Sequence, residues 1–182
     1  MPNKNNWLSF VLKKEIRNTI NEINNKIKNK IKNLEIIDYN LIHITCVFFG
    51  KSLQGKTINI LKSANKIIME YIKKLKEMNI TLIFDRFDYL PFNKKEKKLL
   101  IAIYKNNNKL KSWNLNLRKE LYKLGICNYI TDDFMPHVTI GKVKNIHKSL
   151  KFEKYPNINI NDLYLDGIKN KYILNNYIFK NK

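Results

Sequence analysis

Two segments of the chain each place a histidine and a threonine two residues apart in an apolar run. The first segment, LIHITCVFFG, contains His43 and Thr45, and the second, MPHVTIGKV, contains His137 and Thr139. Runs of β-branched and aromatic residues are typical of β-strands, whose side chains alternate between two faces. We therefore expect each histidine to share a strand face with its threonine, while the residue between them points the other way.

These residue types in this pattern point to acid–base chemistry on a phosphate ester. Histidine has an unperturbed pKa near 6.5, so at neutral pH one ring can accept a proton while another donates one. Two rings flanking a phosphodiester could activate a water and protonate the departing oxygen. The threonine hydroxyls could donate hydrogen bonds to phosphate oxygens. We thus predict His43 and His137 as the acid–base pair, without assigning the base, and Thr45 and Thr139 as phosphate ligands.

The alternative interpretation is that the histidines are ordinary strand residues. A single His-x-Thr is common by chance, but two in equivalent contexts are much harder to dismiss. The third histidine, His147, lies in a lysine-rich segment without a following threonine, which is typical of a surface residue. The sequence has no C-x-x-C and no H-x-x-x-H, so we expect no metal and no cofactor.

Hydrophobic periodicity predicts an alternation of strands and helices. The expected strands are 7–12, 40–49, 80–84 continuing to 89–91, 99–104, 134–143, 158–168 and 172–180. The expected helices are 14–34, 55–78 and 108–124, the last capped by Gly125. Strand, helix and histidine strand thus occur in that order twice, which indicates two similar lobes. No Gly/Ser linker separates them, so residues 1–182 are predicted to form one bilobal domain.

Composition indicates a folded protein. Hydrophobic residues make up 44% and charged residues 27% of the 182 residues. No apolar stretch approaches the roughly 20 residues of a membrane span, and the short run 7–12 is followed by charges without a cleavage site. We therefore expect a cytoplasmic protein whose two cysteines, Cys46 and Cys127, are reduced.

The formal net charge of +20 would attract a polyanion such as RNA. However, 32 of the 35 basic residues are lysines in a chain rich in Asn and Ile, a bias that an A/T-rich coding sequence also produces. The charge is compatible with RNA binding and does not by itself establish it.

The paired motifs resemble the signature of a known family, the two-histidine (2H) phosphoesterases. HITCVFFGK is similar to the pattern H-x-T-φ-x-F-φ-G, and PHVTIGK to P-H-x-T-φ-x-R, most closely as in the LigT-like RNA 2′,3′-cyclic phosphodiesterases. The order of elements agrees over nearly the whole chain. The resemblance implies an α+β, LigT-like bilobal fold in which two antiparallel sheet lobes with outer helices enclose a central groove. It also implies metal-independent hydrolysis of 2′,3′-cyclic phosphates on RNA ends or nucleotides, commonly to 2′-phosphates. Separately, we expect a monomeric protein that does not associate with membranes.

One position departs from the family pattern. Lys142 stands where the family often has arginine, and it can supply charge to a phosphate but not a bidentate fork. Strict alternation would place Lys142 on the face opposite His137, unless the strand bends at Gly141. Alternation also puts Phe49 on the face of His43, which makes it a candidate for stacking on a base, although a core position is the stronger expectation.

Other activities of the same site remain open from sequence. Relatives of this kind cleave 2′-5′ linked oligoadenylates, trim 3′ ends of small RNA, or join RNA through a 2′-5′ linkage. A further alternative is a module that binds nucleotides or RNA without catalysis. With all four motif residues present, an enzyme is the favoured interpretation.

Overall fold

The computed structural model describes residues 6–90, 98–127, 130, 133–144 and 154–166, with the side chains of residues 6 and 164–166 left aside. These residues form three α-helices: α1 (Lys14–Lys30), α2 (Ile58–Glu77) and α3 (Asn108–Lys123). The longer strands are β1 (Asn6–Leu12), β3 (His43–Gly50), β5 (Phe84–Leu90), β6 (Lys98–Tyr104), β7 (His137–Val143) and β9 (Leu163–Asp166). The short strands are β2 (Glu35–Ile36), β4 (Thr81–Leu82) and β8 (Ile158–Asn159), and 3-10 turns occupy Tyr39–Leu41 and Ile160–Asp162. None of the described helices is both long and apolar enough to cross a membrane.

The main sheet has seven strands in the order β5-β6-β7-β3-β1-β9, with β2 also paired to β7. All of its pairings are antiparallel, and β4 and β8 form a separate antiparallel pair. The predicted α+β class with antiparallel sheets is therefore confirmed.

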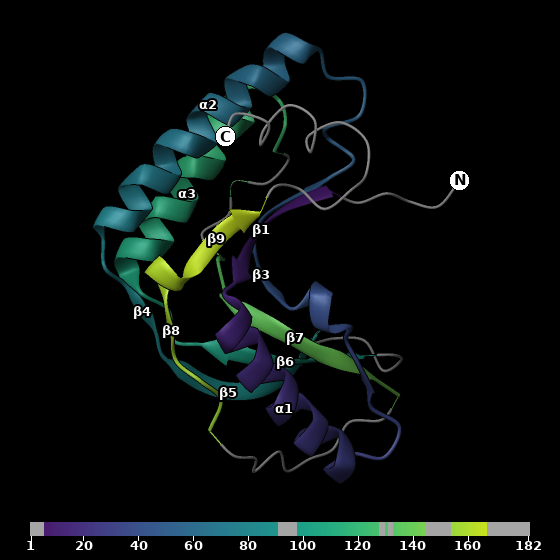
Figure 1. The fold of residues 1–182 in the computed structure, drawn as a ribbon. Helices are drawn as coiled ribbons and strands as arrows, with labels where there is room; N and C mark the ends of the chain where they lie inside the picture. The colour runs from purple at the N-terminus through teal and green to yellow at the C-terminus, as the bar shows by residue number, and fades with distance from the viewer. Residues whose placement is uncertain (1–5, 91–97, 128–129, 131–132, 145–153, 167–182) are drawn as a thin grey trace.

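The sheet consists of two halves that meet at the two histidine strands. One half is β5-β6-β7 and the other is β3-β1-β9, and the two are bridged where Ile44 lies opposite Val138. The strands of the two halves run at a steep angle to each other (Figure 1). Each histidine strand pairs with the strand that precedes it in its repeat, β1 with β3 and β6 with β7. These halves correspond to the two lobes expected from the repeat.

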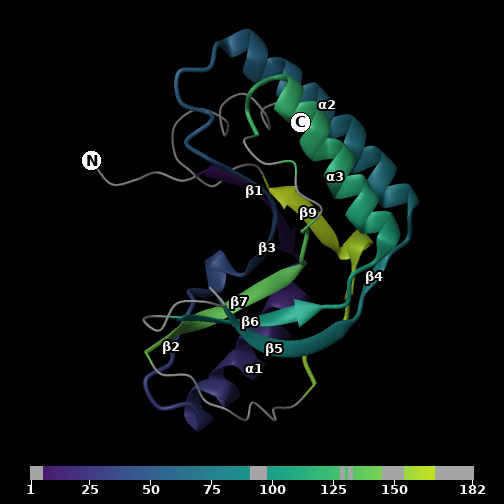
Figure 2. The same ribbon diagram turned by 180° about the vertical axis from the view of Figure 1, so that it is seen from behind.

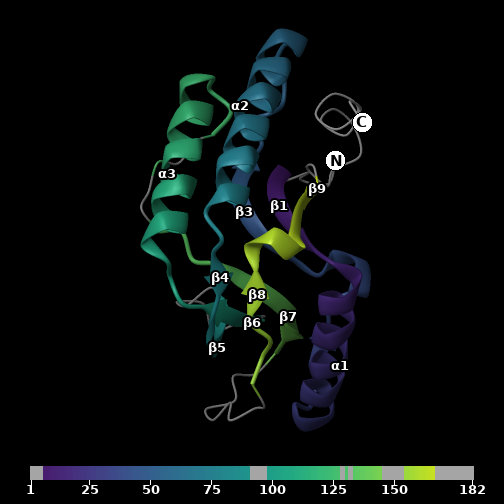
Figure 3. The ribbon, with the colours of Figure 1, turned by 60° about the vertical axis from the view of Figure 1, so that its left-hand side comes forward.

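The helices cover one face of the sheet, and two of them, α1 and α3, each lie on the half to which they do not belong by sequence. Helix α3, which follows β6, packs on the other half: Trp113 contacts Phe10 of β1, and the Asn114 amide donates to the Cys46 carbonyl of β3 at 2.7 Å. Helix α2 lies beside α3, as Figure 3 shows. Helix α1, which follows β1, lies beside β5-β6-β7, as Figure 2 shows from behind. There Tyr155 donates to Asn24 of α1 at 2.8 Å while its ring packs on Phe84 and Phe87 of β5.

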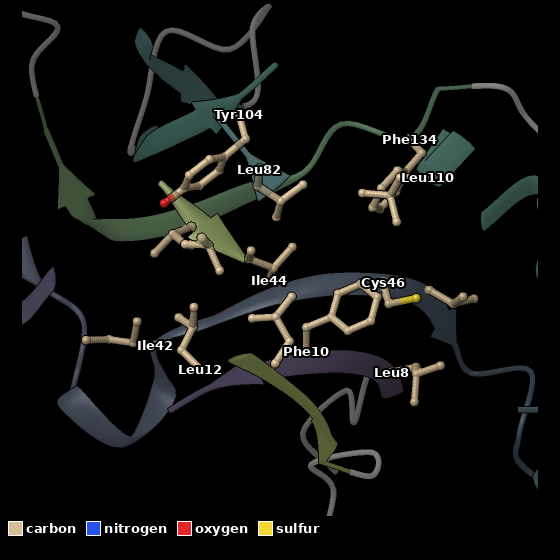
Figure 4. Packing of buried hydrophobic residues seen from close by; sticks show 14 of the residues in the cluster. Leu8, Phe10, Leu12, Ile42, Ile44, Cys46, Leu82, Tyr104, Leu110 and Phe134 are labelled. Atoms are coloured by element: carbon tan, nitrogen blue, oxygen red, sulfur yellow. The ribbon is translucent and has the colours of Figure 1, made fainter. Parts of the chain in front are cut away.

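The core is continuous across both halves because residues of every second position on the strands point toward the helices. Phe10 and Ile44 from one half lie close to Tyr104 from the other and to Leu82 of β4 (Figure 4). Each of these four residues is no more than 2% exposed. The opposite face of the sheet carries the histidine motifs.

Several element boundaries differ from those expected, for local physical reasons. Helix α1 ends at Lys30 rather than 34 because the next residue is extended and Asn33 adopts a positive φ of 69°. Strand β7 begins at His137 rather than 134 because the preceding Pro136 has no N–H to donate. The segment expected as strand 158–168 is divided by the 3-10 turn, and the expected strand 172–180 lies outside the described residues. Gly125 ends α3 with a φ of 66°, as predicted.

Candidate active site

The two His-x-Thr motifs lie side by side at the centre of the sheet. Since Ile44 is opposite Val138 in an antiparallel pair, continuing the register by one residue places His43 beside Thr139 and Thr45 beside His137. Both residues of the central pair are fully buried, whereas the four motif residues are partly exposed on the other face. The histidines occupy diagonal positions, which in antiparallel pairs lie about 7–8 Å apart. That spacing leaves room for one phosphate between two rings.

A β-bulge in β7 places Lys142 on the same face as His137 and Thr139. Pairing of β7 with β6 shifts by one residue after Thr139, so that Ile140 is the extra residue. The residues opposite His137, Thr139 and Lys142 are then alternate residues of a single strand, Ile103, Ile101 and Leu99. Because directly opposed residues share a face, all three β7 side chains do so. The strand bends one residue before Gly141, and Lys142 is exposed on the motif face.

Strand β3 has an equivalent bulge, three residues after its histidine. Pairing with β1 shifts between Thr45 and Val47, so Cys46 is the extra residue, as Ile140 is three residues after His137. The shift carries Phe48 to the motif face, where it is 45% exposed. Phe49 is 1% exposed and belongs to the core, so the prediction of a core position is confirmed and that of a stacking role is wrong. Phe48 and Lys142 are thus equivalent positions of the two halves.

Both histidines are held by the same hydrogen bond. The Nδ1 atom of His43 is 2.6 Å from the Leu41 carbonyl oxygen, and that of His137 is 2.9 Å from the Met135 carbonyl oxygen. A carbonyl can only accept, so Nδ1 carries the proton in both rings. This leaves Nε2 of each ring as the atom that can accept or donate a proton toward a ligand. The Thr45 hydroxyl lies 3.4 Å from Nε2 of His43, beside that reactive atom.

The environments of the two rings differ. Burial lowers the pKa of His137 below its ordinary value of 6.5, and the hydrogen bond to Met135 offsets only part of that effect. A neutral His137 with its proton on Nδ1 presents a lone pair at Nε2. The arrangement suits a proton acceptor at neutral pH.

His43 is covered by an aromatic ring instead. The indole of Trp7 is stacked on it, with ring centroids 5.9 Å apart and an angle of 14° between the planes. In the β1–β3 register, Trp7 is opposite Phe48 and Val11 is opposite His43. On this face, the Ser9–Thr45 pair lies between those two pairs, and the indole of Trp7 extends past it to reach His43. Ser9 is small and fully buried. Trp7 thereby fixes the plane of the His43 ring.

Sequence reasoning missed Trp7 and Phe48. Alternation cannot reveal a bulge, so it assigned the wrong phenylalanine, although Phe48 is the residue that aligns with the phenylalanine of the H-x-T-φ-x-F-φ-G pattern. No signal in the sequence connected Trp7 with the motif. Within the described part of the chain, no group of three or more His, Cys, Asp or Glu side chains could hold a metal ion. His147 lies outside the described residues.

The fold is that of the LigT-like two-histidine phosphoesterases. The structure of Escherichia coli LigT without ligand superposes with a TM-score of 0.52 at 16% identity, covering 88% of this chain and 81% of that one. TT0787 of Thermus thermophilus gives 0.54 at 13% identity, with 91% and 86% covered. A protein described as a phosphoesterase gives 0.52 at 15% identity, with 88% and 82% covered. No protein-family model and no curated protein matches the sequence.

Proposed function

We propose that the protein is a metal-independent phosphodiesterase that hydrolyses 2′,3′-cyclic phosphates of RNA ends or nucleotides, leaving 2′-phosphates. The observation that carries this proposal is the pairing of the two motifs on one face of β3 and β7. Each histidine there is anchored through Nδ1, which makes Nε2 the ring atom for proton transfer. Two such groups on opposite sides of one phosphate are what an in-line displacement by water requires.

The proposed step forms one bond to phosphorus and breaks another. His137, neutral at neutral pH because burial lowers its pKa, takes a proton from water through Nε2. The water oxygen attacks phosphorus and the bond from phosphorus to the ribose O3′ breaks. His43, protonated at Nε2, gives its proton to O3′, so the product carries a 2′-phosphate and a free 3′-hydroxyl. The hydroxyls of Thr45 and Thr139 donate to the non-bridging oxygens, where negative charge increases in the transition state.

Phe48 is proposed to contact the base of the nucleotide that carries the cyclic phosphate. Its ring is exposed on the motif face next to Trp7. The β3 side of the site therefore has an aromatic surface at the position where the β7 side has Lys142. A base stacks on such a ring whatever its sequence. Structures of E. coli LigT with 3′-AMP and with NADP+, at 16% and 15% identity and TM-scores of 0.50 and 0.51, show that this fold can hold nucleotides in another protein.

Turnover of 2′,3′-cyclic AMP with identification of the product tests the proposal. We expect 2′-AMP, and we expect His43→Ala and His137→Ala each to lower turnover roughly 10²–10⁴-fold. His147→Ala, which changes the remaining histidine, is the matched control and should retain activity. Full activity in both motif variants would exclude the assigned site, and a strong loss with EDTA would point to a metal enzyme.

The same assay separates the alternative activities. A 2′-5′ linked dinucleotide should be cleaved more slowly than the cyclic nucleotide, and RNA with a 5′-hydroxyl and a cyclic end should be hydrolysed at that end rather than joined. Preferential cleavage or joining of these substrates would identify a 2′-5′ phosphodiesterase or a 2′-5′ ligase. Tight binding of AMP without turnover of any substrate would identify a binding module.

A further inference from the structure

A hollow of about 310 Å³ lies where β7 ends, against the segment that joins α1 to β2. It is lined by Asn33, Glu35, Lys142, Val143 and Lys144. Lys142 links the hollow to the active site, because the bulge at Ile140 places it on the same face as Thr139. The hollow is thus reached by following one strand away from the proposed phosphate ligands.

The backbone builds this hollow through two features. Gly141 lets β2 approach closely: a Cβ atom there would lie 2.3 Å from the Glu35 carbonyl oxygen. The positive φ of Asn33 turns the chain after α1 so that β2 pairs with β7, placing Glu35 opposite Lys142. The two lysines and the asparagine therefore come together from segments more than a hundred residues apart in sequence.

The charges at this position favour an anion. Two exposed ammonium groups face one exposed carboxylate, that of Glu35, and the Asn33 amide adds a neutral donor. Because of the bulge, Thr139 and Lys142 lie opposite Ile101 and Leu99, which are two residues apart, or about 7 Å along a strand. This is the scale of the separation between a terminal phosphate and the nearest internal phosphodiester of a nucleic acid chain.

We propose that this hollow is a second phosphate site, which binds an internal phosphodiester of an oligonucleotide whose cyclic end lies at His43 and His137. The inference rests on the proposed function and adds to it the substrate class: a chain of at least two nucleotides rather than a mononucleotide. A positively charged site that contacts phosphates binds the nucleic-acid backbone whatever the base sequence. Glu35 weakens the site, because it lowers the formal charge of the lining from +2 to +1.

Two variants of opposite sign test the site. Lys144→Ala removes a positive charge and Glu35→Gln a negative one, and Lys73→Ala, exposed on α2, is the control for loss of a lysine elsewhere. kcat/KM is measured for 2′,3′-cyclic AMP and for a tetranucleotide that ends in a 2′,3′-cyclic phosphate, over a series of salt concentrations.

For the tetranucleotide, we expect Lys144→Ala to lower kcat/KM about two- to fivefold, the range of one exposed charge contact. We expect Glu35→Gln to raise it by a similar factor. The salt slope should fall by about 1 in Lys144→Ala. The changes for the cyclic mononucleotide should be clearly smaller, and Lys73→Ala should change neither substrate.

Equal changes for both substrates, or an effect of Lys144→Ala no greater than that of Lys73→Ala, would overturn the second site. Failure of the proposed function looks different, since the wild-type protein would then turn over neither substrate. In that case, binding of the tetranucleotide with a terminal 2′-phosphate, followed by fluorescence anisotropy, still tests the site. Affinities that rank Glu35→Gln above wild type and wild type above Lys144→Ala would support it, and equal affinities would reject it.

Discussion

At the scale of single residues, the two halves of the site share an anchor and differ in their surroundings. Each imidazole donates from Nδ1 to the carbonyl two residues before it, which sets the same tautomer in both. His137 is then shielded by burial, whereas His43 lies under the indole of Trp7. Different environments around chemically identical groups are how enzymes separate an acid from a base.

The lowered pKa of His137 sets the expected pH dependence of the proposed hydrolysis. The proposed base, His137, must be neutral to accept a proton, so activity should fall as pH drops through the pKa of His137. Because burial holds that pKa below 6.5, we expect the acidic limb of kcat/KM to lie below pH 6.5. A pH–rate profile on 2′,3′-cyclic AMP measures it. An acidic limb above pH 7 would show that His137 is not the base.

Trp7 is expected to act on the reaction through His43. Trp7→Ala removes the ring that is stacked on His43, and a stacked aromatic pair contributes about 0.5–1.5 kcal/mol, so we expect kcat to fall about two- to tenfold. Trp7→Phe should restore most of the activity because a ring is again present. Trp113→Phe, which changes the other, buried tryptophan, should leave kcat unchanged. A loss confined to KM would assign Trp7 to substrate contact alone.

At the scale of elements, the sequence predicts the helices and strands but not the bulges within the strands. Periodicity placed the three helices and the histidine strands, and the repeated order of elements indicated two halves. It could not place Lys142 or choose between Phe48 and Phe49, because one inserted residue reverses every later side chain of a strand. The bulges arise from pairing with β1 and β6, and pairing partners are not encoded in the local pattern.

Gly141 allows β2 to pack closely against β7 beside the candidate site. Gly141→Ala would drive a methyl group into the Glu35 backbone, so β2 must move away from β7. We expect a loss of about 1–3 kcal/mol in the free energy of unfolding, as for other overpacked positions, together with a raised KM as Lys142 shifts. Urea denaturation and steady-state kinetics measure the two effects.

Gly55→Ala provides the comparison for this variant. Gly55 has a φ of 73° with open space around it, so the alanine costs backbone strain without displacing a neighbour. It should lower stability and leave KM unchanged. An unchanged KM in Gly141→Ala would show that the position of β2 does not affect substrate binding.

At the scale of the whole molecule, the crossed helices join the two halves into one structure. Periodicity identifies the apolar face of α1 and of α3, but not the half of the sheet on which that face will pack. The structure places α3 against β1 and β3, and α1 against the β5-β6-β7 half through Tyr155. Neither half can therefore complete its core without a helix from the other repeat.

This arrangement predicts that the halves unfold together. Ile20→Ala in α1 and Leu117→Ala in α3 both truncate fully buried side chains and should each cost about 2–5 kcal/mol. In a Trp7→Phe background, Trp113 on α3 is the remaining tryptophan and reports on the β3-β1-β9 half. Its fluorescence transition in urea should coincide with that of the far-UV circular dichroism. Ile20→Ala, although it lies on the other half, should shift both to the same lower midpoint. A Trp113 transition that stays at the wild-type midpoint while the dichroism splits into two steps would show that the halves are independent, and that the site between them does not depend on their joint folding.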